Sequence, residues 1–198
     1  MTFNVHKTRV TVSFFFFVTA CVALVLDTTD TAALAICAAV IHESGHLVCM
    51  LIYGERPSEI FLAPFGMSIT RLPCGSCGRE AVIAFAGPAA NLFAAVVLGV
   101  FMLVCKNSSL LKAVAVNIAL AAFNLLPIEP LDCGRAVRYL LISKFNTLRA
   151  ERTAFVLGVV FLVPLSAMGF FVLIRSRYNV TLLIASVYLS WMLLKRKR

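Results

Sequence analysis

The sequence has little charge, few acidic residues and few histidines. Only 14% of its 198 residues are charged, nine are acidic and three are histidine. Hydrophobic residues make up 61% of the chain, and the mean hydropathy is +0.96. Soluble domains carry about 25% charged residues, so this composition excludes an ordinary soluble globular domain. We therefore predict an integral membrane protein.

Apolar runs long enough to cross a bilayer occupy most of the chain. A spanning helix needs about 20 apolar residues, in a range of about 17–25. Six windows fit, at residues 10–26, 31–53, 81–104, 110–128, 154–174 and 178–194. We expect one all-α polytopic membrane domain over residues 1–198, because the connections are too short for a separate soluble domain. The first window also fits a signal peptide, since Lys7 and Arg9 precede it and Ala33-Leu-Ala35 resembles a cleavage site.

The positive charge of the chain is unevenly placed. The formal net charge is +9, which by itself would fit a nucleic-acid-binding protein. With six spans and a cytosolic N-terminus, 14 of the 18 Lys and Arg residues lie on the inner side and 4 on the outer side. Because Lys and Arg are enriched in cytosolic loops, we expect both termini in the cytosol. The charge then gives no reason to expect a nucleic-acid partner.

The seven cysteines lack the pattern of a disulfide framework. Their number is odd and most lie in apolar runs, which is typical of small buried side chains in a reducing compartment. Cys74 and Cys77 have the C-x-x-C spacing of redox or metal sites, but a single pair is a weak signal. The sequence assigns these two residues no role.

Two of the three histidines lie in one motif inside the second apolar window. In His42-Glu43-x-x-His46 the two imidazoles are four residues apart, on one face of a helix, where both can bind one ion. Glu43 lies beside them and can take a proton from a zinc-bound water. Because polar side chains are costly in a bilayer, a divalent metal is a favourable partner for this cluster. We predict one zinc ion per chain with Glu43 as catalytic base; the alternative is three polar residues packed in a membrane core.

A third ligand is expected in the segment that follows the fourth window, which runs from Asn124 to Gly134. Its two prolines should end the helix, and Gly134 should let the chain turn. Broken backbone at the membrane edge is tolerated where it lines a cavity. We favour Asp132 as the ligand, with Glu129 as the alternative carboxylate. Cys49 shares the histidine face but lies about 10 Å along the axis from the first histidine, which makes it a poor ligand.

Three motifs, in this order, resemble the site-2 protease family of intramembrane zinc metalloproteases. They are His42-Glu43-x-x-His46, Ala86-Gly87-Pro88-Ala-Ala-Asn91 and Asn124-x-x-Pro127-x-x-Pro-Leu-Asp132-x-Gly134. The resemblance implies that both histidines and Asp132 bind zinc, that Glu43 is the base, and that Asn124 holds the substrate or the transition state. From the residues alone, Asn91 and Asn124 also fit hydrogen bonds between neighbouring helices.

Within that family, Leu62-Ala-Pro64-Phe65-Gly66 and the six-span layout look most like the sporulation branch, which cleaves an inactive pro-sigma factor. This likeness implies a membrane-associated protein substrate, inhibitory membrane partners and a bacterial inner or mother-cell-derived membrane. The nucleotide-binding domain common in that branch is not expected here. An anti-sigma factor or a signal-peptide remnant is the alternative substrate. A membrane metal transporter is the alternative function, but it would need no base beside the first histidine.

Residues 59–71 are β-branched and aromatic on either side of Pro64-Phe-Gly66, which predicts a small membrane-associated β-hairpin between the second and third spans. A protease that cuts a membrane helix must hold its substrate extended, and an exposed strand would pair with the substrate backbone. The alternative is an ordinary loop in the membrane interface.

Overall fold

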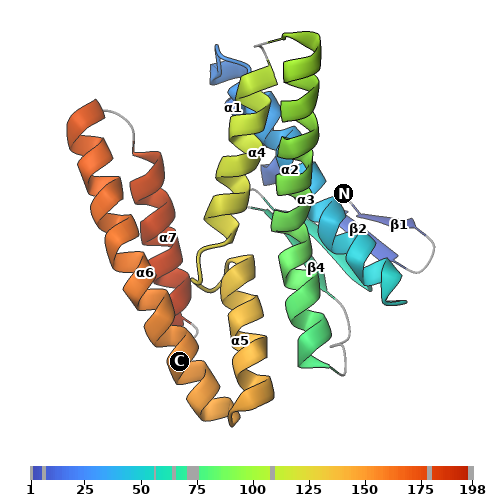
Figure 1. The fold of residues 1–198 in the computed structure, drawn as a ribbon, viewed down its shortest axis with the longest axis vertical. Coiled ribbons are helices and arrows are strands. Elements are labelled where there is room, and N and C mark those ends of the chain that lie inside the picture. Colours follow the sequence, from blue (N-terminus) through green and yellow to red (C-terminus); the bar gives the residue numbers. More distant parts are fainter. Residues whose placement is uncertain are drawn as a thin grey trace. The chain divides into compact units, whose positions relative to one another are not determined.

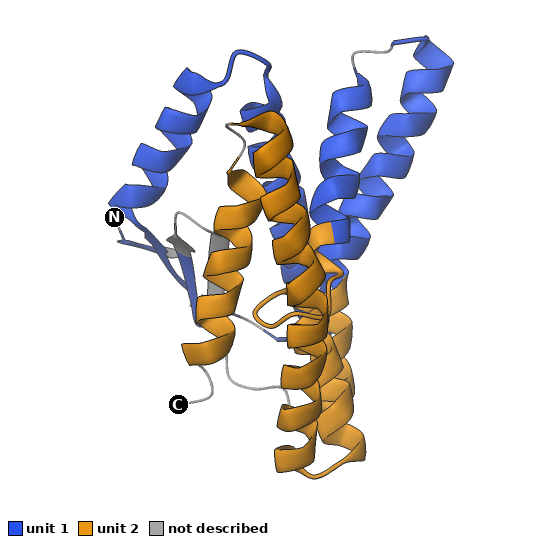
Figure 2. Cartoon of the chain, turned by 90° about the vertical axis from the view of Figure 1, so that its left-hand side faces the viewer, with its two compact units in different colours: residues 1–75, 86–122 blue, residues 76–85, 123–198 orange. Residues whose placement is uncertain are grey.

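The computed structural model describes residues 2–5, 8–55, 57–63, 66–70, 76–107, 110–177 and 180–195. The elements follow one another as β1 (Thr2–Val5), β2 (Thr8–Val12), α1 (Phe14–Leu26), α2 (Thr31–Ile52), β3 (Glu59–Ala63), β4 (Gly66–Thr70), α3 (Cys77–Cys105), α4 (Leu111–Asn124), α5 (Asp132–Lys144), α6 (Thr147–Ser176) and α7 (Thr181–Lys195) (Figure 1). The chain divides into two compact units, one of residues 1–75 and 86–122 and the other of residues 76–85 and 123–198 (Figure 2). We call them unit 1 and unit 2.

Unit 1 contains a four-stranded sheet in the order β1-β2-β3-β4. The predicted hairpin is confirmed as β3 and β4, which pair antiparallel with Glu59 opposite Thr70; residues 64, 65 and 71 of that prediction lie outside the described residues. Strands β2 and β3 run parallel, and the helices α1 and α2 form the crossover that a parallel pair requires. Strands β1 and β2 were not predicted. The first apolar window begins at residue 10, so it includes the last three residues of β2, which ends at Val12.

The connection between α1 and α2 is held by the Asp27 carboxylate. It accepts hydrogen bonds from the backbone N–H groups of Ala32, at 2.5 Å, and Thr29, at 2.8 Å, and from the Thr29 hydroxyl at 2.6 Å. The hydrogen bond from Ala32, followed by those from Thr29, lowers the pKa of Asp27. Lys112, in the first turn of α4, donates to the Thr29 carbonyl oxygen at 3.2 Å. These bonds tie the start of α2, the helix that carries the two motif histidines, to its neighbours in unit 1.

Three helices, α2, α3 and α6, are long and apolar enough to cross a membrane. Helices α1, α4 and α7 are apolar but have 13, 14 and 15 residues. At 1.5 Å per residue, 13 residues extend only about 20 Å, short of a hydrocarbon core of about 30 Å. Six spanning helices are therefore not confirmed within the described residues. Two of the hydropathy windows are longer than the helices they contain. The start of the first window belongs to β2. The fourth helix already ends at Asn124, before Pro127.

No element was predicted between the fourth apolar window, which ends at residue 128, and the fifth, which begins at residue 154. Helix α5 occupies most of that segment, and α6 begins at Thr147 with the Asn146 side chain accepting from the Arg149 N–H at 3.0 Å. One face of α5 buries Ala136 in a small core within unit 2, while Arg138 pairs with Glu151 of α6 at 3.3 Å. A search for continuous apolar runs misses such a helix because its charged face interrupts them.

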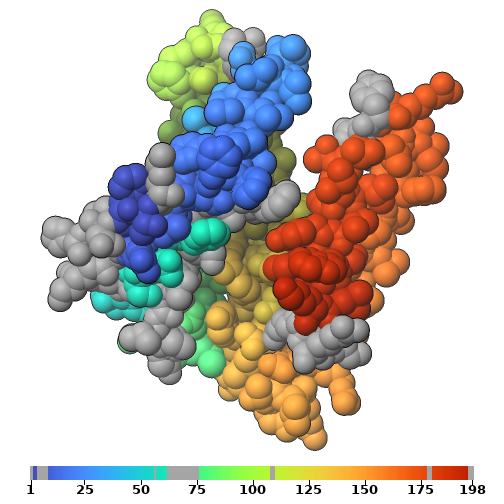
Figure 3. All heavy atoms as spheres, turned by 180° about the vertical axis from the view of Figure 1, so that it is seen from behind, coloured from blue at the N-terminus to red at the C-terminus, as the bar shows by residue number. Residues whose placement is uncertain are grey.

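Helices α6 and α7 pack side by side in unit 2 (Figure 3). Their contact is close, because a Cβ on Gly169 would lie 3.0 Å from the Leu183 nitrogen. The core between them consists of Ile128, Leu131, Leu162, Leu189 and Leu193. The first two of these residues belong to the segment between α4 and α5. This core therefore anchors the loop that leads to Asp132.

Candidate metal centre

The two histidines of the His-Glu-x-x-His motif lie on one buried face of α2. The buried residues of this helix are Ala38, His42, His46 and Met50, spaced four apart. The Nε2 atoms of the two imidazoles are 3.3 Å apart. Two nitrogens bound at about 2.0–2.1 Å to one tetrahedral zinc ion lie about 3.3–3.4 Å from each other. The spacing of the pair thus matches that of two ligands of one ion.

Small residues let α3 approach α2 at this point. A Cβ on Gly45 would lie 2.5 Å from the Ala86 carbonyl oxygen and 2.7 Å from the Ala90 Cβ. A Cβ on Gly87 would lie 2.7 Å from His42 Nε2 and would also collide with the imidazole of His46. Glycine at position 87 therefore leaves the space that the nitrogen-bearing edges of both rings occupy.

A buried asparagine on α3 contacts the outer nitrogen of the first histidine. Asn91 Oδ1 lies 2.6 Å from His42 Nδ1, and Asn91 Nδ2 donates to the Ala38 carbonyl oxygen and to Asn117 Oδ1, both at 2.9 Å. The expectation that Asn91 bonds neighbouring helices is confirmed, because these partners lie on α2 and α4. Its contact with His42 was not predicted, and the sequence offered only the presence of a polar residue in an apolar span as a signal.

Asp132 is the first residue of α5, and its side chain is buried, with a relative exposure of 2% for the residue. An acidic residue is favoured there because the helix N-terminus carries partial positive charge. Arg135, one turn further, donates to one carboxylate oxygen of Asp132. The expectation that Gly134 lets the chain turn is wrong, since Gly134 lies inside α5. Its role is packing: a Cβ there would lie 2.5 Å from the Glu129 backbone nitrogen.

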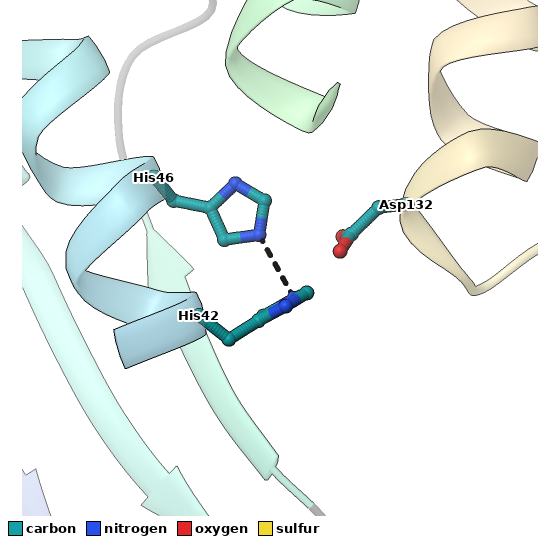
Figure 4. A group of neighbouring side chains, drawn as sticks. All are labelled: His42, His46 and Asp132. Atoms are coloured by element: carbon teal, nitrogen blue, oxygen red, sulfur yellow. Dashed lines mark hydrogen bonds between the residues drawn. The ribbon is translucent and has the colours of Figure 1, made fainter. Parts of the chain in front are cut away.

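Among the described residues, His42, His46 and Asp132 form a group that could hold a metal ion. One ligand atom of each lies within 4.8 Å of the others, and all three residues are buried (Figure 4). Two imidazoles and one carboxylate are a donor set used by catalytic zinc, with a fourth position left for water. Glu129 is not in this group. It lines a cavity of about 350 Å³ in unit 2, together with Pro130, Arg135, Met192, Leu193 and Lys195.

The contacts described above assign no role to the other residues that the sequence singled out on α2, α3 and α4. Glu43 follows His42 on α2 and is half-buried. Asn124 is the last residue of α4 and is half-buried. Cys49 is half-buried and is not part of the metal-binding group. Cys77 begins α3, whereas residue 74 lies outside the described residues.

Comparison with known proteins finds similarity to metalloproteases. Residues 105–165 match the model of Peptidase family M50, a segment that includes Asp132 but neither motif histidine. A curated zinc metalloprotease of Methanocaldococcus jannaschii is 30% identical over 126 residues, which are 60% of this chain and 36% of that protein. The chain thus spans about a third of the length of that relative. A solved structure, the site-2 protease from the same organism, is similar with a TM-score of 0.70 at 21% identity, covering 100% of this chain and 95% of that one.

The chain has the fold of a site-2 protease. The fold expected from the three sequence motifs is therefore confirmed in its coarse form, as a mostly helical membrane-protein fold with a small sheet. The family match and the curated relative both support a zinc metalloendopeptidase, and the donor set of the metal-binding group supports zinc. These matches do not support the sporulation branch in particular.

Proposed function

We propose that this chain is an intramembrane zinc metalloendopeptidase in which His42, His46 and Asp132 bind one zinc ion and Glu43 is the general base. The observation that carries this proposal is the group of three buried ligands, one atom of each lying within 4.8 Å of the others. The match to Peptidase family M50 and the zinc metalloprotease relative support the same chemistry.

Each residue has a defined task in peptide hydrolysis. Zinc, when bound, polarises the scissile carbonyl and acidifies a water molecule. Glu43 lies about 100° round α2 from His42, where its carboxylate accepts the proton of that water and passes it to the leaving amine. Asn124 donates from its side-chain amide to the substrate carbonyl oxygen. Arg135 pairs with one carboxylate oxygen of Asp132 and holds this side chain in place.

The substrate class follows from the fold and from the sheet. The site-2 protease fold supports a membrane protein as substrate. An unwound membrane segment exposes backbone groups that need partners, and β4 is an edge strand of the sheet in unit 1. Pairing of an extended substrate with this edge satisfies those groups. The sequence resemblance favours a pro-sigma factor, with inhibitory membrane partners, over an anti-sigma factor or a signal-peptide remnant.

A membrane metal transporter is the less favourable function. It would also place His and Asp side chains in apolar helices. The matches to a peptidase family and to a zinc metalloprotease fit the protease better. A transporter also gains nothing from a carboxylate placed next to the first histidine.

The decisive experiment is Glu43→Gln. We expect this variant to keep its fold and its zinc but to lose about 10²–10⁴-fold in cleavage rate, because only the general base is removed. The measurement is co-expression with candidate pro-sigma factors and immunoblotting for a shortened product, with zinc content determined on the purified protein. Glu55→Gln, the same change beyond the end of α2, is the control and should cleave normally. Wild-type processing by Glu43→Gln would refute the mechanism.

A further inference from the structure

A chain of buried hydrogen bonds runs through unit 1 from α4 to the first motif histidine. Asn117 Nδ2 donates to the Ala113 carbonyl oxygen at 2.9 Å. Asn117 Oδ1 accepts from Asn91 Nδ2 at 2.9 Å, and the same nitrogen donates to the Ala38 carbonyl oxygen at 2.9 Å. Asn91 Oδ1 lies 2.6 Å from His42 Nδ1. Both asparagines are buried, with a relative exposure of 0% for Asn91 and 3% for Asn117.

Backbone carbonyls fix the direction of this chain. A carbonyl oxygen can only accept, so the Asn117 amide must present its nitrogen to Ala113 and the Asn91 amide must present its nitrogen to Ala38. Both N–H bonds of Asn91 are then used, one to Ala38 and one to Asn117. The remaining atom of the amide, Oδ1, can only accept, and it faces His42 Nδ1. That ring nitrogen must therefore carry the hydrogen.

With the hydrogen on Nδ1, the Nε2 atom of a neutral His42 carries a lone pair that can accept a hydrogen bond or bind a metal. This Nε2 atom points toward the other motif histidine, whose Nε2 is 3.3 Å away and can donate to it in the metal-free chain. The edge of the His42 ring that carries Nε2 also lies against Gly87. The tautomer that the asparagines select is thus the one in which the nitrogen beside His46 is able to bind a metal.

We propose that Asn91, supported by Asn117, is a positioning residue that locks His42 in the Nδ1-protonated tautomer and aims its Nε2 lone pair at the metal. Metal-binding histidines usually donate their other N–H to a carboxylate, a backbone carbonyl or water. An amide oxygen performs the same task without adding a negative charge to an apolar helix bundle, where a charge would be costly. The role toward zinc rests on the proposed function, whereas the tautomer itself requires no metal.

The first test is the tautomer of wild-type protein. The full chain, labelled with ¹⁵N-histidine, is purified in detergent without metal, and the ring nitrogens are observed by NMR. The chain has three histidines, so His6→Gln and His46→Gln variants assign the signals. We expect the His42 signal to show hydrogen on Nδ1. Hydrogen on Nε2 in wild-type protein would overturn the proposal, whatever the variants do.

The second test separates positioning from helix packing. Asn91→Leu, of similar size, should give a mixture of His42 tautomers and lower the zinc affinity about 10–100-fold, as measured by competition with a chromophoric chelator. Asn91→Asp retains an oxygen that can face Nδ1 and should keep the wild-type tautomer and most of the affinity. Asn117→Leu removes a buried hydrogen bond between helices but leaves the partner of His42, so it should lower thermal stability more than zinc affinity.

The outcomes distinguish this inference from the proposed function. Unchanged zinc affinity in Asn91→Leu, with a loss of thermal stability equal to that of Asn117→Leu, would reduce Asn91 to a packing residue and overturn the proposal. If Asn91→Leu fails to fold, the wild-type tautomer and the behaviour of Asn91→Asp still decide. If wild-type protein binds no zinc, the proposed function fails, and the tautomer measurement keeps its meaning.

Discussion

Gly87→Ala should damage the metal centre while leaving the helices largely stable. The added Cβ would lie 2.7 Å from His42 Nε2 and would collide with the ring of His46. Overpacking of a filled interior costs about 1–3 kcal/mol, and replacing glycine by alanine inside a helix gains about 1 kcal/mol. The net loss of stability is therefore small, at roughly 0–2 kcal/mol from these two terms.

The effect of Gly87→Ala on chemistry should be much larger. The two rings have to move away from the new methyl group, and a displacement of about 1 Å at a reacting centre can cost about 10²-fold in rate. We expect a clear fall in zinc affinity and in cleavage, with only a modest shift in melting temperature. Chelator competition, processing of a co-expressed substrate and thermal unfolding in detergent measure these three quantities.

Gly99→Ala is the matched control for this change. Gly99 lies on the same helix, and among the described residues outside its own helical turn a Cβ there would meet no atom within 4 Å. This variant should bind zinc normally and be as stable as wild-type protein or slightly more so, because the gain in helix propensity is unopposed. If Gly87→Ala also binds zinc with wild-type affinity, then α3 does not hold the two imidazoles in place, and the reasoning from packing is refuted.

Three further predictions concern the third ligand, the loop before it and the topology. Asp132→Ala should remove most of the bound zinc and Glu129→Gln should retain it; the reverse result, by metal analysis, would transfer the role to Glu129. Gly134→Ala should destabilise the protein more than Gly158→Ala in thermal unfolding. The first Cβ would meet the rigid Glu129 backbone at 2.5 Å, and the second would meet a flexible leucine tip at 3.3 Å. Reporters fused after residue 198 and within 133–153 should report cytosol, and one within 105–112 the outer side; an external C-terminus would refute the six-span topology.

The histidine pair could be predicted because it depends on local geometry alone. Residues four apart on any α-helix share a face, so His42 and His46 needed no knowledge of the rest of the chain. The end of α4 before Asp132 could also be predicted, because Pro127 and Pro130 lie close together there and α4 ends at Asn124. Single prolines do not have this effect here, since Pro88 and Pro164 lie inside α3 and α6. In both cases the sequence determines the result within about one turn of the residue concerned.

Contacts between distant residues were not predictable in the same way. Asn91 and His42 are 49 residues apart, and nothing in either local pattern names the other as its partner. Helix α5 was missed for a related reason: its apolar face is continuous only in three dimensions, against Ala81 and Ala84. Strand β2 was missed although four of its five residues, Thr8, Val10, Thr11 and Val12, are β-branched and favour a strand. It continues directly into the apolar run that follows, so it was read as part of that run.

The packing of α2 against α3 explains why small and polar residues matter more here than large apolar ones. In lipid, apolar side chains gain little by moving from the bilayer into a helix interface. The association of these helices has to come from close backbone approach, as at Gly45 and Gly87, and from buried hydrogen bonds, as at Asn91. Phe93, two residues after Asn91 on α3, is 71% exposed, so truncating it should leave the metal centre unchanged. A single methyl group added at Gly87 should not.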